Sequence, residues 1–421
     1  MTYIAKIKKR LYFVVASYFR FFANISLRRW KPRVIAVTGS VGKTTMLNLI
    51  ESQLGPSAHY SHNANSASGI SFDILGLRGV TGSKLYWFYL FIAAPLRSLY
   101  FRHTEEFYIV EIDGERPRET EFIAEWLKPE VTIWISLGLS HAAFYDQEVV
   151  KGRFKTLQDA IAHEFSMLPK HTKSLTLVDI DNNLMRNTTK NIPSTVKSLN
   201  KKAVTHYTVA PTRTEFTINK KTFKFSHPIP RDVSIQLVML VELMAYLDIP
   251  INYDLSSFIM PPGRNNFLQG KNGLIIIDSS YNAHLISMTS ILDMAKALRA
   301  DHKWLVIGDI IEQGTSEKSE HEKLAKLIDS VKAEQVVLVG RRTSAYTYPL
   351  LKNTPAVSFI KPQDALSYLE KHLTGQETII FKGSQYLEWI IEKLLADPAD
   401  KSLLPRQDIA HRRRRQSWGL E

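Results

Sequence analysis

The clearest pattern in the chain is an alternation of short apolar runs with longer segments whose apolar residues recur every three or four positions. In the first half, β-branched and aromatic runs predict strands at residues 34–37, 107–112, 131–137 and 174–178. Segments with helical spacing lie between or beside them, at residues 46–54, 119–126 and 147–167. Strands that alternate with helices of this length indicate an α/β fold with a mostly parallel sheet.

A second α/β unit is predicted in the last third of the chain. Its strands are expected at residues 274–277, 304–307, 336–339 and 379–381, and its helices at residues 286–298, 319–331 and 387–395. Before it come a small antiparallel piece within residues 201–226, with strands at 214–218 and 222–225, and a helix at residues 233–247. The loop Met260–Asn266 contains two prolines and a glycine and is a predicted domain boundary.

Residues 1–30 are predicted to form one amphipathic helix. Apolar residues recur at helical spacing, and basic residues interrupt them: Ile4, Ile7, Leu11, Val14, Val15 and Tyr18 against Lys6, Lys8, Lys9, Arg10 and Arg20. No run approaches the ~20 apolar residues that span a bilayer, and no small-residue cleavage site follows an apolar core. Two interpretations stay open: a helix at a membrane interface, or a helix that packs on its own domain.

A second apolar segment runs from Leu85 to Ala94 and is predicted to end at Pro95. Ten residues are too few to cross a membrane. The segment is therefore either a helix of the protein core or an interfacial helix beside the first one. Its aromatic content favours the interface.

Composition and charge narrow the classes of protein. The chain has 421 residues, 44% hydrophobic and 23% charged, which is typical of a globular protein of two or three domains. It lacks cysteine, which excludes disulfides, thiolate metal sites and cysteine nucleophiles. The net charge is +13, and basic residues gather at both ends, with seven in residues 1–30 and five arginines from Arg406 to Arg415. Such ends suggest an anionic surface, either lipid headgroups or nucleic acid, although the C-terminal run is equally interpreted as a solvated tail.

The most informative motif is Thr38-Gly39-Ser40-Val41-Gly42-Lys43-Thr44-Thr45, which lies between a predicted strand and a predicted helix. Glycines let the backbone approach phosphate oxygens, and the N–H groups at the start of a helix point at the anion. A lysine in this position reaches the β- and γ-phosphates, and the next hydroxyl offers a ligand to Mg²⁺. We therefore expect a nucleotide phosphate site formed by Gly39, Ser40, Gly42, Lys43, Thr44 and Thr45.

Two further strand ends carry candidate chemistry. The run Ile109–Gly114 ends a strand with Glu111, and a carboxylate beside a phosphate loop typically binds Mg²⁺. The run Ser136–His141 ends the next strand with a histidine. A lone histidine is more often structural, but beside Glu111 it becomes a candidate for metal or phosphate binding.

Several motifs, taken together and in order, resemble the Mur ligase family, with spacing closest to its MurF branch. The resemblance covers roughly residues 33–395. Its most specific pieces are Asp278–Ala283, the run Gly308–Gly314 followed by His321-Glu322, and Lys382-Gly383-Ser384. The segment Asn63–Ile70 is similar to the asparagine-rich loop that follows the phosphate-loop helix in this family.

The resemblance implies a fold with a central P-loop ATPase domain, at residues 31–266, and a smaller Rossmann-like C-terminal α/β domain, at residues 267–396. Residues 1–30 and 397–421 would flank them as a basic helix and a basic tail. It also implies an ATP- and Mg²⁺-dependent ligase that acts in the cytoplasm and phosphorylates a substrate carboxylate, such as that of a muramyl peptide. An amine such as D-Ala-D-Ala then attacks the acyl phosphate.

The resemblance also assigns roles to individual residues. Lys43 and Thr44 would serve the phosphates and a first Mg²⁺, and Glu111 and His141 would be further metal ligands. Nucleotide contacts are implied for Arg264, Asp278 and Asn282, and for Gln236 in place of the family's adenine-facing asparagine. The family's carbamylated lysine, which holds a second Mg²⁺, corresponds to Lys155 by gapless counting, whereas another alignment places His163 there and leaves no carbamate.

Some positions depart from the family pattern. Asp232 stands where a histidine is usual, and His284-Leu285 replaces an Asn-Pro pair. Only 38 residues precede Gly39, so the uridine-nucleotide domain of the family is not expected in this chain. The basic helix and the segment 85–94 suggest a lipid-linked or membrane-proximal acceptor, with the protein at the inner face of the membrane.

Three hypotheses about function follow. The first is an active MurF-like ligase, with Lys43, His141 and Lys155 as catalytic residues. The second is a membrane-associated ATP-binding protein on the same scaffold that has lost ligation, which the departures at Asp232 and His284 favour. The third, a nucleic-acid-binding ATPase, rests on net charge alone, and no segment resembles a recognition module.

Overall fold

A computed structural model of the chain describes residues 3–62, 64–79, 84–138, 142–281, 283–311, 313, 316–383 and 386–420. The chain forms two compact units, described separately below. Unit 1 comprises residues 1–201 and 235–251, and unit 2 comprises residues 202–234 and 252–421. The predicted division of the chain at about residue 266 stays a prediction.

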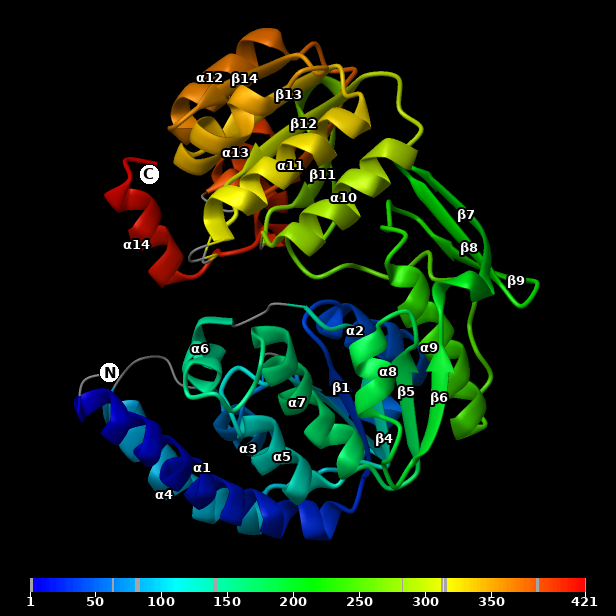
Figure 1. The fold of residues 1–421 in the computed structure, drawn as a ribbon, viewed down its shortest axis with the longest axis vertical. Coiled ribbons are helices and arrows are strands. Elements are labelled where there is room, and N and C mark those ends of the chain that lie inside the picture. Colours follow the sequence, from blue (N-terminus) through cyan, green and yellow to red (C-terminus); the bar gives the residue numbers. More distant parts are fainter. Residues whose placement is uncertain are drawn as a thin grey trace. The chain divides into compact units, whose positions relative to one another are not determined.

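Unit 1 is built on a six-stranded sheet with the strand order β2-β3-β1-β4-β5-β6, in which every pairing is parallel (Figure 1). Its strands are β1 (Arg33–Thr38), β2 (Ala58–Tyr60), β3 (Phe107–Ile112), β4 (Val131–Trp134), β5 (Leu175–Asp179) and β6 (Thr195–Leu199). The central strand β1 is flanked by β3, where Thr38 lies opposite Ile112, and by β4, where Thr38 lies opposite Trp134. The α/β class and the parallel central sheet are confirmed.

Helices lie between and beside these strands, and most of them, but neither the third nor the eighth, were predicted from the apolar spacing. They are α1 (Tyr3–Trp30), α2 (Lys43–Leu54), α3 (Ala67–Ile74), α4 (Lys84–Tyr100), α5 (Glu119–Leu127), α6 (Ala142–Val150), α7 (Leu157–Lys170), α8 (Asn183–Thr188) and α9 (Val233–Leu247). One face of the sheet packs its alternate residues, such as Val34, Ala36 and Val110, against α1, α3, α4 and α5. β1 is buried on both sides and is therefore held in place. The loop that follows it starts from this fixed point.

The predicted helix at residues 147–167 is two helices, α6 and α7, separated by residues 151–156. Gly152 adopts a positive φ of 70°, which ends the first helix. Thr156 then starts the second one with a capping box, because its hydroxyl accepts the N–H of Asp159 while the Asp159 carboxylate accepts the N–H of Thr156. The apolar spacing continued across this break, so the periodicity alone did not show it.

α4 extends beyond the predicted end at Pro95 and reaches Tyr100. Proline has no N–H to donate to the carbonyl four residues earlier, which here belongs to Phe91. The hydroxyl of Tyr18, on α1, donates to that carbonyl at 2.7 Å. A side chain of the neighbouring helix therefore replaces the missing hydrogen bond, and the helix continues through the proline.

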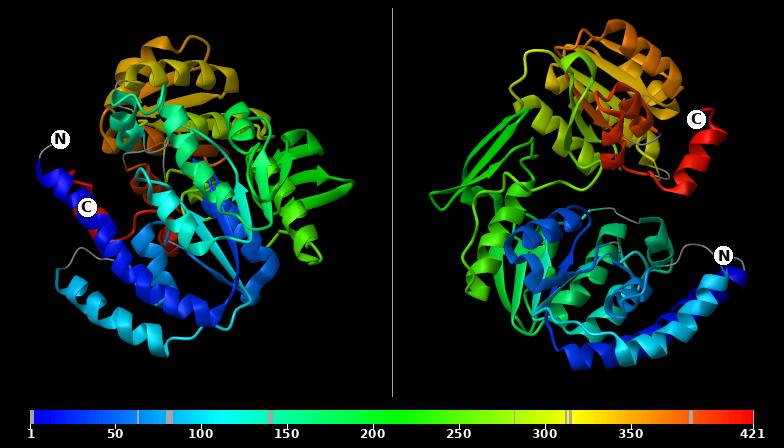
Figure 2. Two further views of the ribbon diagram at one scale, coloured as in Figure 1. Left: turned by 60° about the horizontal axis from the view of Figure 1, so that its bottom comes forward. Right: turned by 180° about the vertical axis from the view of Figure 1, so that it is seen from behind.

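The two helices run parallel and side by side (Figures 1 and 2). Near their C-terminal ends, Arg29 donates to the carbonyls of Ser98 and Leu99, the latter at 2.9 Å. These carbonyls lie in the last turn of α4, where no helix N–H is available for them. Phe19, which is fully buried, packs against Phe91 with 5.0 Å between the ring centres. α1 therefore packs on its own domain, which was one of the two interpretations left open by the sequence.

Unit 2 contains a mixed six-stranded sheet with the order β10-β11-β15-β12-β13-β14. The strands are β10 (Asn266–Gln269), β11 (Ile275–Ser279), β12 (Lys303–Gly308), β13 (Gln335–Val339), β14 (Ala356–Phe359) and β15 (Thr378–Lys382). All neighbours are parallel except β10, which pairs antiparallel with β11. The sequence analysis predicted a loop where β10 begins and overlooked β14.

Helices cover both faces of this sheet. α12 (Pro362–His372) and α13 (Leu387–Leu394) pack on one face, and α10 (Leu285–Ala297) and α11 (Glu317–Val331) on the other. A separate antiparallel sheet of β7 (Val204–Ala210), β8 (Arg213–Ile218) and β9 (Lys221–Phe225) also belongs to unit 2. The predicted basic tail contains α14 (Ile409–Ser417), in which Arg415 is fully buried, 3.7 Å from Glu392.

None of the helices in the described part of the chain combines the length and the apolar content needed to cross a bilayer.

The contact between Tyr18 and Phe91 leads to a test by double substitution. Tyr18→Phe should lower the free energy of unfolding by about 1 kcal/mol, because the Phe91 carbonyl loses its donor. In a Pro95→Ala background the same substitution should cost less, because the new N–H of residue 95 can donate to that carbonyl. Chemical denaturation of the four proteins measures this coupling.

Tyr100→Phe is the matched control, because Tyr100 lies on α4, the helix that contains Pro95, with 78% of its surface exposed. It should leave stability unchanged in both backgrounds. Equal costs of Tyr18→Phe with and without Pro95 would show that the hydroxyl does not replace the helix hydrogen bond.

Candidate functional site

The loop between β1 and α2 has the backbone of a phosphate-binding turn. Gly39 and Gly42 adopt φ angles of +142° and +89°, which other residues rarely adopt. A Cβ atom on Gly42 would lie 2.6 Å from the side-chain nitrogen of Gln236, and one on Gly39 would lie 2.9 Å from the backbone of Ser136. Both glycines are therefore required by conformation and by space. α2 begins directly after the turn, so its first N–H groups are available to an anion.

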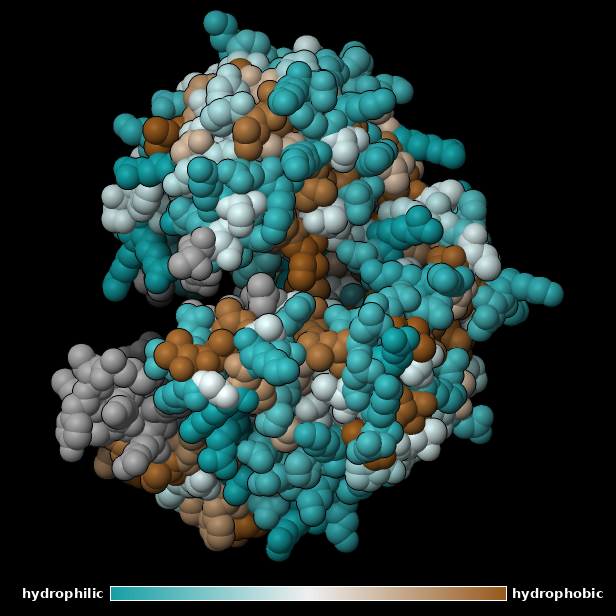
Figure 3. Space-filling model, viewed as in Figure 1, coloured by the Kyte–Doolittle hydropathy of each residue, from teal (hydrophilic) through white to brown (hydrophobic). Residues whose placement is uncertain are grey.

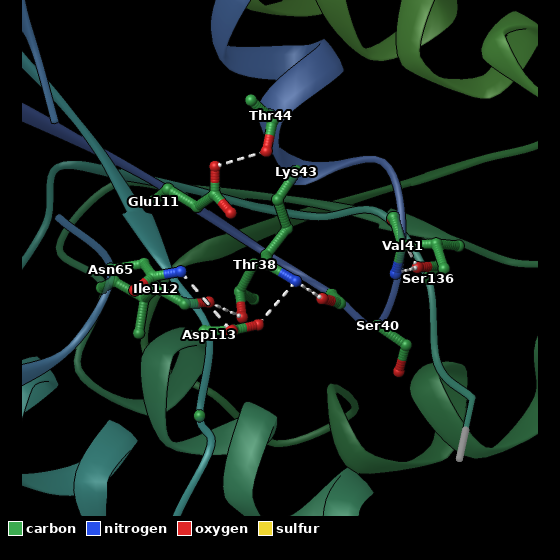
Figure 4. A network of polar contacts seen from close by, with 12 residues as sticks. Thr38, Ser40, Val41, Lys43, Thr44, Asn65, Glu111, Ile112, Asp113 and Ser136 are labelled. Atoms are coloured by element: carbon green, nitrogen blue, oxygen red, sulfur yellow. Dashed lines mark hydrogen bonds and ion pairs between the residues drawn. The ribbon is translucent and has the colours of Figure 1, made fainter. Parts of the chain in front are cut away.

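The ammonium group of Lys43 lies inside this loop. Its Nζ donates to the carbonyl of Gly39 at 2.6 Å and lies 2.8 Å from a carboxylate oxygen of Asp113 (Figure 4). Lys43 is only 8% exposed, so its charge depends on these two partners. Asp113 is positioned in turn by Asn65, whose carbonyl accepts the N–H of Asp113 at 3.2 Å.

Thr44 and Glu111 form the second pair at this site. The Thr44 hydroxyl donates to the Glu111 carboxylate at 3.0 Å (Figure 4). Thr44 comes from the first turn of α2 and Glu111 from the adjacent strand β3, so two different elements bring these oxygens together. A hydroxyl and a carboxylate beside a phosphate loop are the oxygen ligands that Mg²⁺ prefers. The donor set therefore fits a nucleotide-bound Mg²⁺.

The loop is attached to the segment that follows β4. The Ser136 hydroxyl accepts the N–H of Val41 at 2.9 Å and lies 2.8 Å from the carbonyl of the same residue. On the preceding residue of the turn, the Ser40 hydroxyl accepts the N–H of Gly138 at 2.7 Å. These contacts hold the turn in one conformation without using the N–H groups at the start of α2.

Gln236 lies on α9 next to the same loop, close to Gly42. It is 5% exposed, and its Oε1 has no hydrogen-bond partner among the described residues. A buried amide oxygen without a partner costs free energy unless a ligand or water satisfies it. This orphaned acceptor supports the predicted contact between Gln236 and a nucleotide.

The predicted residues of the second unit form a separate cluster of buried charges. Asp278 is the last residue but one of β11 and is fully buried; one of its oxygens accepts the N–H of Ser280 at 2.9 Å, and the other has no partner in the described chain. Burial raises the pKa of Asp278 to about 6. Burial, together with the nearby Arg264 guanidinium, lowers the pKa of Lys382 to about 7. Two titrating groups of opposite charge thus lie at the ends of adjacent strands.

Arg264 and Arg406 extend this cluster. The guanidinium of Arg264 lies over the ring of Tyr281 at 4.9 Å, and that of Arg406 lies at 5.8 Å from the same ring. Arg406 also donates to the carbonyl of Ser280 at 3.1 Å and lies 3.4 Å from the buried carboxylate of Glu388. It therefore fixes the segment that follows Asp278.

Two other motif residues have structural roles. The Asp309 carboxylate accepts the N–H of Thr343 at 2.8 Å and that of Arg342 at 3.2 Å, which holds the turn after β13. His321 is fully buried; its Nε2 accepts the N–H of Ile310 at 3.2 Å while Nδ1 contacts the carbonyl of Glu317. Both side chains connect the end of β12 to its neighbours.

Three predicted residues are not connected to these sites by any described contact. His141 and Asn282 fall outside the described residues. Lys155 is exposed on the segment between α6 and α7, and no hydrogen bond or ion pair joins it to another described residue. His163, the alternative to Lys155, lies on α7 and contacts the ring of Phe154, with 5.1 Å between the ring centres.

Phe154 and His163 line a cavity of about 220 Å³ between α5, α6 and α7. Glu164 also lines it and is 4% exposed; its carboxylate accepts the N–H groups of Arg118 and Thr120, both at 2.7 Å. These N–H groups start α5, so the carboxylate acts as its cap. Burial raises the pKa of Glu164 to about 7, against the lowering effect of these hydrogen bonds.

Three residues of these sites were not selected from the sequence. Asp113 follows Glu111 by two positions, and its place at the same strand end was a usable signal. Ser136 acts through its hydroxyl on a loop almost a hundred residues away, and Arg406 reaches Ser280 from the predicted tail. Nothing in the local sequence marks the last two.

Comparison with known proteins gives one family match. Residues 263–385 match the model of the Mur ligase glutamate ligase domain. The UDP-N-acetylmuramoyl-tripeptide–D-alanyl-D-alanine ligase of Rickettsia prowazekii is 23% identical over 364 residues, covering 84% of this chain and 76% of the relative. The ligase of the same name from Bacillus subtilis is 24% identical over 388 residues, covering 89% and 79%.

Solved structures show the same fold. The MurF ligase from Thermotoga maritima, in complex with ADP, superposes with a TM-score of 0.72 at 19% identity, covering 92% of this chain and 84% of that one. A MurF from Acinetobacter baumannii gives a TM-score of 0.70 at 19% identity, covering 90% and 80%.

The buried Glu164 leads to a pH test. Its pKa is about 7 in the folded protein and near the ordinary 4.5 in the unfolded chain, so between these values only the folded state retains the proton. Glu164 therefore makes the protein less stable as the pH rises from about 4.5 to about 7, by roughly 3 kcal/mol in total. Glu164→Gln should flatten this part of the stability profile, measured by chemical denaturation.

Glu125→Gln, at an exposed position on the neighbouring helix α5, should leave the slope as it is. A profile of Glu164→Gln parallel to that of the wild type would contradict the raised pKa.

Gln236 provides a test of the nucleotide site. Gln236→Ala should raise the dissociation constant of ADP about tenfold, because a buried hydrogen-bonding group is lost. Gln236→Asn, which keeps the amide, should bind ADP more tightly than the alanine variant. Gln363→Ala, a substitution of the same type on α12, is the control. Unchanged ADP affinity in Gln236→Ala, measured by calorimetry, would place the nucleotide elsewhere.

Proposed function

Since this chain belongs to the Mur ligase family, we propose that it is an ATP-dependent amide ligase of the MurF type. It would activate the carboxylate of a muramyl peptide, or a related substrate, and join it to an amine such as D-Ala-D-Ala in the synthesis of a cell-wall precursor. The observation that carries the proposal is the pair Thr44–Glu111 beside the buried ammonium of Lys43.

The proposed reaction must bring two anions together. A substrate carboxylate oxygen attacks the γ-phosphorus of ATP, the bond to the β-phosphate oxygen breaks, and ADP leaves. The amine then attacks the acyl carbon, loses a proton, and inorganic phosphate leaves with the electrons of the C–O bond. Lys43 and the N–H groups at the start of α2 lower the repulsion in the first step, because their positive charge faces the phosphates. Thr44 and Glu111 would hold Mg²⁺, which supplies further neutralisation when bound.

Lys43 has to change partners during this reaction. In this structure its ammonium group is paired with Asp113 at 2.8 Å. An ammonium has three donors, so it can contact phosphate oxygens while one donor remains on the Gly39 carbonyl. We therefore assign to Asp113 the role of holding Lys43 in the loop before the nucleotide arrives.

The proposal extends to the residues of unit 2. Asp278 and Arg264 would contact the nucleotide, as the family resemblance implies, and the free oxygen of Asp278 supports a ligand contact there. Asn282 and His141 keep their assigned roles as predictions. Lys155 would hold a second Mg²⁺ only if carbamylated, and its exposed position leaves its amine accessible to carbon dioxide.

A second candidate function is ATP binding without ligation. The specific observations in its favour are the substitutions at Asp232 and at His284-Leu285, together with the absence of any hydrogen bond or ion pair to Lys155 in the described chain. Such a protein would keep the loop and the Thr44–Glu111 pair and would use the family scaffold for binding or regulation.

Phosphate release separates the two functions. The protein is incubated with ATP, Mg²⁺, D-Ala-D-Ala and muramyl tripeptides, either nucleotide-linked or lipid-linked. The ligase should release phosphate only when both the peptide and the amine are present. Glu111→Gln should lower kcat at least a hundredfold, because one metal-binding oxygen is lost. Lys43→Ala should lower kcat/KM by a similar factor.

The matched controls are Glu370→Gln and Lys371→Ala, which make the same changes at exposed positions on α12. Both should retain full activity. ATP binding without phosphate release on any acceptor would support the second function. Phosphate release that is independent of the amine would contradict both.

A further inference from the structure

The outward side of the α1–α4 pair is unusually apolar. On α4, the residues at spacings of three and four turn the same way and are between 49% and 84% exposed: Leu85, Phe88, Tyr89, Ile92, Leu96 and Leu99. On α1, Leu11, Val14 and Phe21 are 52%, 65% and 63% exposed. The opposite faces of both helices are buried, as Phe19 and Leu90 show. Each helix therefore has two apolar faces, of which one has no partner in the described chain.

This concentration is local to the two helices. Of the 21 large hydrophobic residues that are exposed in the described chain, ten lie on α1 or α4. Figure 3 shows brown side chains gathered where these helices lie, at the lower left. Single exposed apolar residues are normal, whereas a contiguous patch marks an interaction surface. The two parallel helices make this patch continuous, because Tyr18 and Arg29 tie them together along their length.

The charged residues of the two helices themselves have one sign. The first acidic residue of the chain is Glu51, and none occurs from residue 74 to residue 104. Arg28, Lys31 and Arg97 are exposed at the C-terminal ends of the two helices. The sequence places Lys6, Lys8, Lys9 and Arg10 near the start of α1. An apolar stripe with cations at both ends is the pattern of a helix that lies in a membrane interface.

The charge also distinguishes between possible occupants. A second copy of the chain, packed face to face, would bring two uniformly cationic helix pairs together, which repulsion disfavours. A bilayer with anionic headgroups offers acyl chains to the stripe and opposite charge to its ends. Neither helix is long and apolar enough to cross that bilayer, so the pair would lie along it.

We propose that the outward faces of α1 and α4 form a docking surface for an anionic lipid bilayer. Phe88, Ile92 and Phe21 insert among the acyl chains, and Arg28, Lys31 and Arg97 pair with lipid phosphates. The surface is independent of the ligase proposal, because it uses none of the nucleotide-site residues. It would bring that site to a substrate anchored in the same membrane.

The test measures binding of the full chain to vesicles, without nucleotide or peptide. Vesicles of phosphatidylcholine with phosphatidylglycerol are compared with phosphatidylcholine alone in a co-sedimentation assay at low and high salt. Binding should require the anionic lipid and weaken at high salt. The variant Leu85→Ser/Phe88→Ser/Ile92→Ser should bind at least tenfold more weakly, because three inserted side chains become polar.

Two further variants make the result specific. Tyr348→Ser/Leu350→Ser/Ile360→Ser replaces three exposed apolar residues of unit 2 and should bind like the wild type. Arg28→Gln/Arg97→Gln should bind anionic vesicles more weakly than the wild type, because two of the cations that pair with lipid phosphates are lost. Because the substituted side chains point outward, thermal unfolding and ADP affinity of every variant should match the wild type, which excludes misfolding as the cause.

Three results would overturn the proposal: no binding to anionic vesicles, equal binding by the Leu85/Phe88/Ile92 variant, or a dimer in analytical ultracentrifugation that this variant abolishes. The last result would assign the surface to a second copy of the chain. Since no ligase substrate is present, none of these outcomes depends on whether the chain catalyses amide formation.

Discussion

The proposed nucleotide site depends on the requirement that a nearly buried ammonium group must have polar partners. Lys43 is 8% exposed, and the loop meets this requirement with the Gly39 carbonyl and the Asp113 carboxylate. Asp113 can do so because β3 pairs with β1 in a register that places their ends side by side. The parallel sheet, the glycine turn and the start of α2 therefore contribute to one electrostatic arrangement, and the proposed binding of phosphate would change the partner of Lys43 within it.

Much of the fold could be predicted because local spacing agreed with the final packing. β3 and α9 have the predicted bounds, since each is mostly apolar and is followed directly by an aspartate. The predictions were wrong where a distant contact overrides a local signal. α4 passes through Pro95 because Tyr18, on another helix, supplies the missing donor. The sequence around Pro95 does not contain this donor, so the local pattern could not reveal it.

The residues of the candidate site were likewise predictable where they belong to a local motif and not where their contacts are distant in the sequence. Lys43, Thr44 and Glu111 could be proposed from their motif, because the chemistry of phosphate binding requires these groups in this order. Their contacts with each other depend on the order of the strands in the sheet, which could not be predicted from the sequence. Ser136 and Arg406 were not selected, since each acts on residues about a hundred or more positions away. Lys155 and His163 remain alternatives, because Lys155 lies within the α6–α7 break and His163 lies beyond it.

The proline in α4 has an evolutionary consequence. Because Pro95 leaves a carbonyl that the Tyr18 hydroxyl satisfies, the two positions share one energetic constraint. Loss of the tyrosine is harmful while the proline is present and nearly neutral once it has been replaced. Homologous chains should therefore accept the two changes in one order, proline first, and descendants that keep the proline should retain a hydroxyl or another donor at the facing position of the first helix.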